Sequence, residues 1–165
     1  MRFTIRALLL ILCTQTLTGC IFANIDLSPE TQPYTETVIK SGSGKKIALI
    51  DITGGITDHT PSAPIFGVTP ESMMKRVIDQ LHKAKRDDDV AAIVLKIDSP
   101  GGSVTASDLI HREIMKIKTQ TDKKVVAVLM DTAASGGYYV AVAADKIIAH
   151  PTTVTGSIGV IMQTF

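Results

Sequence analysis

Two glycine-rich segments each follow a short apolar run and precede a stretch of helical periodicity. The first is DSPGG at residues 98–102, and the second is DTAASGG at residues 131–137. The carboxyl ends of parallel strands meet at one edge of a sheet, so both segments are expected to face one crevice, where ligands of such sheets bind. Glycine lets backbone N–H groups approach a ligand, and a helix start adds partial positive charge. The pair predicts a place that can stabilise an oxyanion.

Ser135 lies at the expected junction of strand and helix, between Ala134 and Gly136. No bulky neighbour would shield its hydroxyl, so it could act as a nucleophile in the manner of a nucleophile elbow, although the G-x-S-x-G spelling is missing. The alternative is that Ser135 caps the helix, while Gly136 and Gly137 allow close packing against a neighbouring helix. Taken alone, this segment favours the capping interpretation.

The elements that must position these segments follow from the spacing of apolar residues. Apolar runs predict strands at 47–52, 91–97, 124–129 and 146–149, and the start of another at 158–162. Helices are predicted from Thr69 to about residue 86, from a capping box of Thr105 with Asp108 through Ile117, and over 135–144. Strands that alternate with helices in this way define the α/β class with a mainly parallel sheet.

Three motifs in combination resemble one known family. They are DSPGG at 98–102, AASGGYY at 133–139 and TGSIGV at 155–160, and the likeness runs from about residue 46 to residue 165. The chain resembles the signal peptide peptidase A group of the S49 serine peptidases. The resemblance implies a ClpP/crotonase-type fold, a homo-oligomeric ring, peptide substrates and no cofactor. It also implies a Ser/Lys dyad in place of a Ser-His-Asp triad.

The resemblance assigns roles to four residues of this sequence. Ser135 is the expected nucleophile, and the N–H groups of Gly102 and Gly136 are the expected oxyanion donors. Ser157 matches a family serine whose hydroxyl orients the catalytic lysine. These roles together imply acyl transfer to a serine, followed by hydrolysis.

The catalytic lysine of the dyad has no clear match in these residues. A lysine acts as a base only when neutral, so burial must lower a pKa that is about 10.4 in water. After Ser135 the sequence has only Lys146, which begins a predicted strand beside Asp145 and is expected to be solvated. The lysine is therefore expected beyond Phe165. On this reading residues 47–165 are the N-terminal part of the peptidase domain, incomplete at the C-terminus and inactive alone.

The first twenty residues differ in kind from the rest. Arg2 and Arg6 precede an apolar run at 7–12, and LTGC at 17–20 looks like a lipobox, in which Cys20 would be acylated. The run is too short for a transmembrane helix, which needs about 20 residues. A lipoprotein-type signal peptide is therefore expected over 1–20, with an ordinary signal peptide and an incidental cysteine as the alternative.

Residues 21–46 contain two prolines and the run SGSG, and they are typical of a flexible tether. With Cys20 as lipid anchor, these predictions place the protein in the bacterial cell envelope, on the exported side of a membrane. Cys13 lies in the predicted leader, so the mature domain would have no thiol for a disulfide.

Composition argues against other classes of partner. The 17 basic and 16 acidic residues nearly cancel and tryptophan is absent, so no nucleic acid is expected to bind. No pair of histidines or cysteines has metal-ligand spacing, so no metal is expected. Asp98 and Asp131 are expected to hold backbone N–H groups in turns. Tyr138 and Tyr139 are expected in core packing or a subunit contact.

Three functions stay open on the sequence. The leading one is a membrane-anchored serine endopeptidase that hydrolyses peptides close to the membrane. A crotonase-like acyl-CoA enzyme also uses paired backbone N–H groups, although an exported lipoprotein would have little access to coenzyme A. A catalytically silent anchored subunit is the third, because the lysine is missing from these residues.

Overall fold

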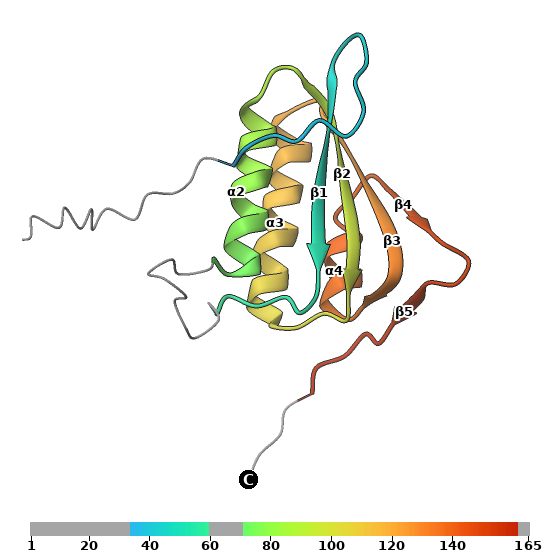
Figure 1. Ribbon diagram of the computed structural model, residues 1–165. Coiled ribbons are helices and arrows are strands. Elements are labelled where there is room, and N and C mark those ends of the chain that lie inside the picture. Colours follow the sequence, from blue (N-terminus) through green and yellow to red (C-terminus); the bar gives the residue numbers. More distant parts are fainter. Residues whose placement is uncertain (1–33, 60–70, 162–165) are drawn as a thin grey trace, which may run out of the picture. The chain divides into compact units, whose positions relative to one another are not determined.

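The computed structural model describes residues 34–59 and 71–161, which include one five-stranded sheet and three helices (Figure 1). The strands run in the order β1-β2-β3-β4, and β5 pairs with a second stretch of β3. All pairs are parallel, which confirms the predicted class. The bounds are β1 (Lys46–Thr53), α2 (Met73–Arg86), β2 (Val90–Ser99), α3 (Val104–Gln120), β3 (Lys124–Ala134), α4 (Gly136–Ala141), β4 (Lys146–Ala149) and β5 (Val154–Gly156).

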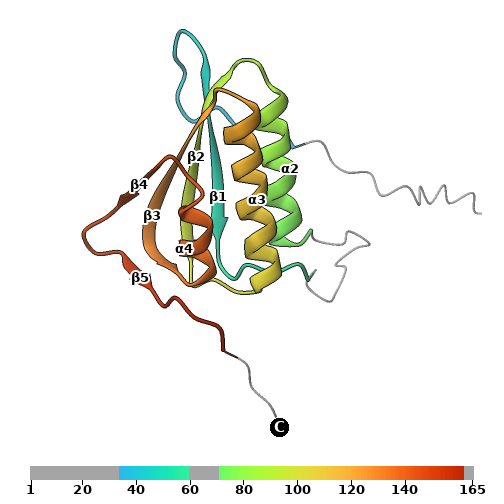
Figure 2. The same cartoon turned by 180° about the vertical axis from the view of Figure 1, so that it is seen from behind.

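The three helices lie on the same face of the sheet (Figure 2). Alternate residues of each central strand point into this layer, because successive side chains of a strand face opposite sides. The core there consists of aliphatic side chains from β1, β2 and β3, namely Ile50, Ile52, Ile93, Leu95, Ile97, Val125 and Leu129. β-Branched residues suit such a pleated, packed surface.

The other face of the sheet is not covered by any of the described helices (Figure 1). We call it the open face. Along each strand its residues alternate with the buried ones, and the strand register places them side by side. They are only partly buried and include Leu49, Asp51, Val94, Lys96, Val126, Val128 and Ile148. At its centre the Lys96 Nζ lies 2.9 Å from the Asp51 carboxylate.

Helix starts differ in detail from the predictions. In α2 the cap is Ser72, whose hydroxyl accepts the Lys75 N–H at 3.2 Å; the predicted start at Thr69 lies outside the described residues. The capping box predicted at Thr105 is wrong, because Ser103 caps α3 and its hydroxyl accepts the Ala106 N–H at 3.4 Å. The predicted shared face of α3 is confirmed, since its isoleucines are buried.

The C-terminal part departs most from the predictions. The strand β3 runs on to Ala134, because β5 supplies hydrogen-bond partners to residues 132–134. Most of the second glycine-rich segment is therefore strand, and α4 is shorter than the predicted 135–144. The strand predicted from residue 158 is wrong for 158–161, which follow β5 without sheet pairing. The preceding residues form the strand instead.

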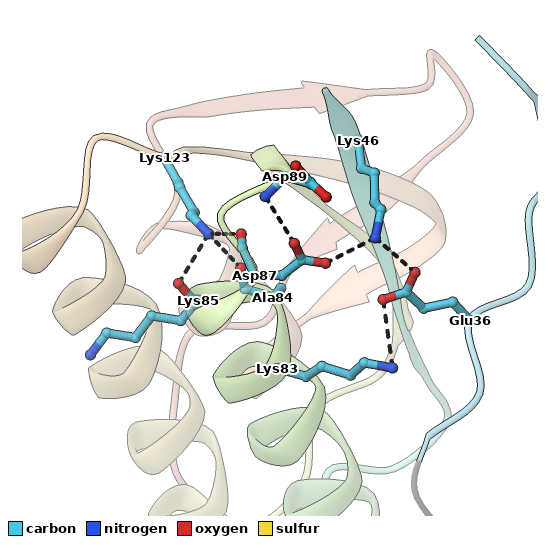
Figure 3. Close-up of polar contacts among 8 residues, drawn as sticks. All are labelled: Glu36, Lys46, Lys83, Ala84, Lys85, Asp87, Asp89 and Lys123. Atoms are coloured by element: carbon cyan, nitrogen blue, oxygen red, sulfur yellow. Dashed lines mark hydrogen bonds and ion pairs between the residues drawn. The ribbon is translucent and has the colours of Figure 1, made fainter. Parts of the chain in front are cut away.

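Charged side chains hold the amino edge, where the parallel strands begin (Figure 3). Lys123 donates to the carbonyls of Ala84, Lys85 and Asp87, at the C-terminus of α2, over 2.5 to 3.0 Å. The Lys46 ammonium lies 3.0 Å from the Asp87 carboxylate. That hydrogen bond raises the pKa of Lys46 and lowers the pKa of Asp87.

Glu36, which precedes β1, forms ion pairs at the amino edge. The Glu36 carboxylate lies 3.2 Å from the Lys46 ammonium and 3.6 Å from that of Lys83 (Figure 3). The flexible tether over 21–46 stays a prediction, because residues 21–33 lie outside the described part. None of the helices in the described residues is long and apolar enough to cross a membrane.

Candidate active site

Ser135 stands where β3 ends and α4 begins, in a strained backbone conformation. Its φ is 50° and its ψ is −121°, a region that residues with a side chain seldom adopt. Its N–H donates to the carbonyl oxygen of Gly156 at 2.8 Å, directly beyond the β3–β5 pairs. Such strain persists only where the surroundings hold it, and it gathers at functional sites.

The Ser135 hydroxyl does not cap the helix. The residue occupies the N-cap position of α4, and its carbonyl oxygen accepts the Tyr139 N–H at 2.9 Å, yet its side chain makes no capping hydrogen bond. The interpretation of this hydroxyl as a helix cap is therefore wrong. Ser135 is half-buried.

The two glycine-rich segments meet at Ser135, as their position after adjacent strands predicted. A Cβ placed on Gly101 would lie 2.6 Å from the Gly136 nitrogen and 2.9 Å from the Ser135 Cβ. A Cβ on Gly136 would collide with the Ser107 hydroxyl of α3, so the predicted close packing against a neighbouring helix is confirmed there. Gly137 is instead close to β2, with its would-be Cβ 2.8 Å from the Ser99 carbonyl oxygen.

A short bridge to Ile56 holds the first glycine loop. The Ile56 N–H donates to the Gly101 carbonyl at 2.9 Å, and the Ser103 N–H donates to the Ile56 carbonyl at 2.8 Å. Neither bond uses the N–H of Gly102, a residue that is itself exposed. A Cβ on Gly102 would clash with the Ile56 carbonyl, so only glycine allows this approach. This bridge was not predicted from the sequence, because it joins segments far apart in the chain.

Two backbone N–H groups are thus candidates for an oxyanion site. The N–H of Gly102 lies outside the bridge to Ile56. Gly136 is the first residue of α4, where N–H groups have no acceptor within their own helix. Gly101 packs directly on Gly136, so the N–H groups of Gly102 and Gly136 belong to neighbouring segments.

The pairing of β3 with β5 brings Ser157 next to Ser135, because each serine directly follows its strand. It follows Gly156, the residue whose carbonyl accepts the Ser135 N–H, and it is exposed. Its φ is 54°, and within the described ranges Ser135 and Ser157 are the two residues other than glycine with a positive φ. Thr155 strengthens the pairing, since its hydroxyl donates to the Ala133 carbonyl at 2.7 Å. The sequence motifs predicted both serines but not their shared strain.

Lys146 lies far from Ser135. It begins β4 in register with Val126, nine residues before Ser135 along β3, and a strand rises about 3.3 Å per residue, which gives about 30 Å. The side chain is exposed, as the sequence predicted. In the described residues no group of histidine, cysteine, aspartate and glutamate could hold a metal ion. Cys20 lies outside the described part of the chain.

Other predicted residues take structural positions around the site. The carboxylate of Asp98 accepts the Thr132 N–H at 3.0 Å, so its predicted hold on a backbone N–H is confirmed. Tyr138 packs against the core, as expected. Tyr139 is exposed, and its hydroxyl donates to Asp108 at 3.0 Å, which raises the pKa of the tyrosine.

The fold of the chain is similar to that of a solved protease. A mutant of the membrane-bound stomatin-specific protease 1510-N, solved with a substrate peptide, superposes with a TM-score of 0.57 and 23% identity. The match covers 73% of this chain and 48% of that one. The chain therefore has an α/β fold of the ClpP-like type, with a strained serine where two glycine loops meet.

Sequence comparison then gives the family. The profile of Peptidase family S49 matches residues 117–165. The chain is 38% identical over 125 residues to the chloroplastic serine protease SPPA of Arabidopsis thaliana, and 38% identical over 128 residues to a putative signal peptide peptidase SppA of Enterococcus faecium. These matches cover 76% and 78% of this chain, but 18% and 36% of the relatives. The chain belongs to the signal peptide peptidase A group of peptidase family S49.

Proposed function

We propose that the intact protein is a serine endopeptidase that hydrolyses peptides, spent signal peptides among them, with Ser135 as its nucleophile. The observation that carries this proposal is the strained Ser135, with a hydroxyl that caps nothing, packed against Gly101. A serine held in this way at the carboxyl edge of a parallel sheet is presented toward a substrate in the crevice.

The proposed chemistry proceeds through an acyl-enzyme. The Ser135 oxygen attacks the scissile carbonyl carbon while its proton passes to the base, and the carbonyl oxygen becomes an oxyanion. The N–H groups of Gly102 and Gly136 hold that oxyanion. Its collapse expels the amine, which takes the proton back from the base, and water then releases the acyl group by the reverse sequence.

We assign the base to a lysine outside the 165 residues, oriented by the Ser157 hydroxyl. Support comes from the position of Ser157, whose neighbour Gly156 bonds directly to Ser135, and from the distance of Lys146 at the opposite edge of the sheet. In this scheme burial of the lysine lowers its pKa far enough for the neutral amine to accept a proton.

We further propose that Cys20 carries a lipid, that the protein faces the exported side of a bacterial envelope membrane, and that intact subunits form a homo-oligomer. The lipobox at 17–20 supports the anchor. Replacing Cys20 with alanine should move the protein from the membrane fraction to the soluble fraction. The matched Cys13→Ala change should leave it on the membrane, because Cys13 would be removed with the leader. Equal fractionation of the two variants would contradict the anchor.

Labelling with a serine-directed fluorophosphonate tests the nucleophile. The intact wild-type protein should be labelled and should cleave a peptide substrate, and Ser135→Ala should lose both reactions by at least a factor of about 1000. The matched control is Ser72→Ala, which removes another serine hydroxyl far along the chain at the cap of α2. Absence of labelling in the wild type would favour the silent subunit. Turnover of an acyl-CoA that persists in Ser135→Ala would favour the crotonase-like enzyme.

A further inference from the structure

Ser99 is a buried serine directly beneath the first glycine loop. It ends β2, and none of its surface is exposed to solvent. Its hydroxyl donates to the Gly54 carbonyl at 2.6 Å and accepts the Gly101 N–H at 3.1 Å. One hydroxyl thus joins the turn after β1 to the loop after β2. The Ser99 hydroxyl and the Gly101 N–H are buried, so each would be costly to leave unpaired.

Ser99 and Ile56 together restrain Gly101, whose carbonyl shares one peptide plane with the Gly102 N–H. Gly101 is held at its N–H by Ser99 and at its carbonyl by the Ile56 N–H. The carbonyl of Gly101 and the N–H of Gly102 belong to one planar trans peptide and point in opposite directions. Restraining the first therefore aims the second away from Ile56. Gly101 has a φ of 94°, where a glycine without such restraints would be free to turn.

We infer that Ser99 is a positioning residue of the proposed oxyanion site, which orients the Gly102 N–H without touching the substrate. This inference rests on the proposed peptidase function. A donor stabilises the transition state only when it lies about 2.7 to 3.1 Å from the oxyanion. Loss of the Ser99 hydroxyl therefore acts mainly on the transition state and leaves binding of the uncleaved peptide intact.

The test compares Ser99→Ala and Ser99→Cys in the intact protein, with Ser72→Ala as the matched control. Cysteine keeps the size of the side chain and a weak donor and acceptor, so it preserves folding if alanine does not. The Ser72→Ala control loses a serine hydroxyl that is also buried, at a helix cap remote from the glycine loops. Each variant is measured for kcat and KM, and for affinity toward a peptide aldehyde, which forms a hemiacetal with a serine nucleophile. Affinity for the uncleaved peptide is measured with each change in a Ser135→Ala background.

The expected result is a fall in kcat and in aldehyde affinity by roughly 10- to 100-fold for Ser99→Ala and less for Ser99→Cys. Peptide affinity in the Ser135→Ala background and the kinetics of Ser72→Ala stay close to those of the respective parent proteins. Equal kcat in wild type and both Ser99 variants, or a matching loss of peptide and aldehyde affinity, would overturn the inference. A wild type that neither cleaves peptides nor reacts with the fluorophosphonate would instead overturn the proposed function itself.

Discussion

The two edges of the same sheet are built in opposite ways. At the carboxyl edge, backbone packs on backbone: a Cβ on Gly101 would lie 2.6 Å from the Gly136 nitrogen, and Ser99 is completely buried. At the amino edge, long side chains pair in solvent, as with Lys46 and Glu36, whose side chains are 47% and 49% exposed. Close backbone contacts fix atoms within narrow limits, whereas exposed ion pairs stabilise a fold weakly. Positional accuracy is concentrated at the edge that carries the proposed chemistry.

The largest expected effect on activity is a difference between alanine substitutions at two glycines that both have a positive φ. Alanine at Gly101 must move the Gly136 amide or the Ser135 side chain, so we expect peptide hydrolysis to fall by at least about 100-fold. The matched control is Gly44→Ala at the amino edge, where φ is 115° and no atom lies within 4 Å of the added Cβ. Gly44→Ala carries only the backbone strain, about 1 to 3 kcal/mol at most. Steady-state kinetics and thermal melts of the two variants compare their activity and stability. Equal activities of Gly101→Ala and Gly44→Ala would contradict the prediction.

A second prediction uses the contact between Gly136 and Ser107. Alanine at Gly136 collides with the Ser107 hydroxyl, so hydrolysis should fall by roughly 10- to 100-fold. Adding Ser107→Gly removes the obstructing side chain and should restore a large part of the rate. A double-mutant cycle on kcat/KM measures the coupling. If the two changes prove additive, steric contact is not what requires glycine at residue 136.

At the amino edge, Lys123→Met should lower stability without changing catalysis. The variant leaves carbonyls at the C-terminus of α2 without their cation, and we expect a loss of about 1 to 2 kcal/mol in the free energy of unfolding. The exposed Glu36→Gln variant serves as the control and should unfold almost as the wild type does. Urea titration gives the stabilities. A change in kcat for Lys123→Met would show that the two edges are coupled.

The smallest expected effect is a dependence on pH at Asp145. Its carboxylate accepts the Val125 N–H at 2.8 Å, and this bond lowers the pKa of Asp145 below its usual 3.8. A carboxylate with a lower pKa in the folded state stabilises the fold above its unfolded pKa, and this contribution disappears as the pH falls through the folded value. The stability difference between wild type and Asp145→Asn should therefore be larger at about pH 6 than at about pH 3. Urea titrations at both pH values measure it, and a constant difference would contradict it.

The sequence predicted the parts of the structure that depend on neighbours in the chain. Short apolar runs located β1, β2 and β3, and the spacing of the isoleucines in α3 predicted its buried face. The rule that adjacent parallel strands end at one edge brought the two glycine segments together. Ser135 could be named as a candidate because small residues surround it.

The remaining features depend on contacts between distant segments. The strain at Ser135 and Ser157 is held by the pairing of β3 with β5, and the loop of Gly101 is held by Ile56 and Ser99. Local propensities do not specify such contacts, since each of these residues could also occur in an ordinary turn. The capping box at Thr105 was wrong because a nearby serine could serve as well: Ser103 caps α3, and its own N–H donates to the distant Ile56 carbonyl.

The ion pair on the open face of the sheet has a consequence for how that face can pack. Flat apolar strands attract other strands and promote aggregation unless charge interrupts them. The ion pair of Lys96 and Asp51 lies among Leu49, Val94, Val126 and Val128 on adjacent strands. Its two charged groups make dry stacking of a second sheet unfavourable, while the lysine stem still shields apolar surface. Within the described residues, this pair therefore interrupts an otherwise apolar surface with charge, as gatekeeper residues do.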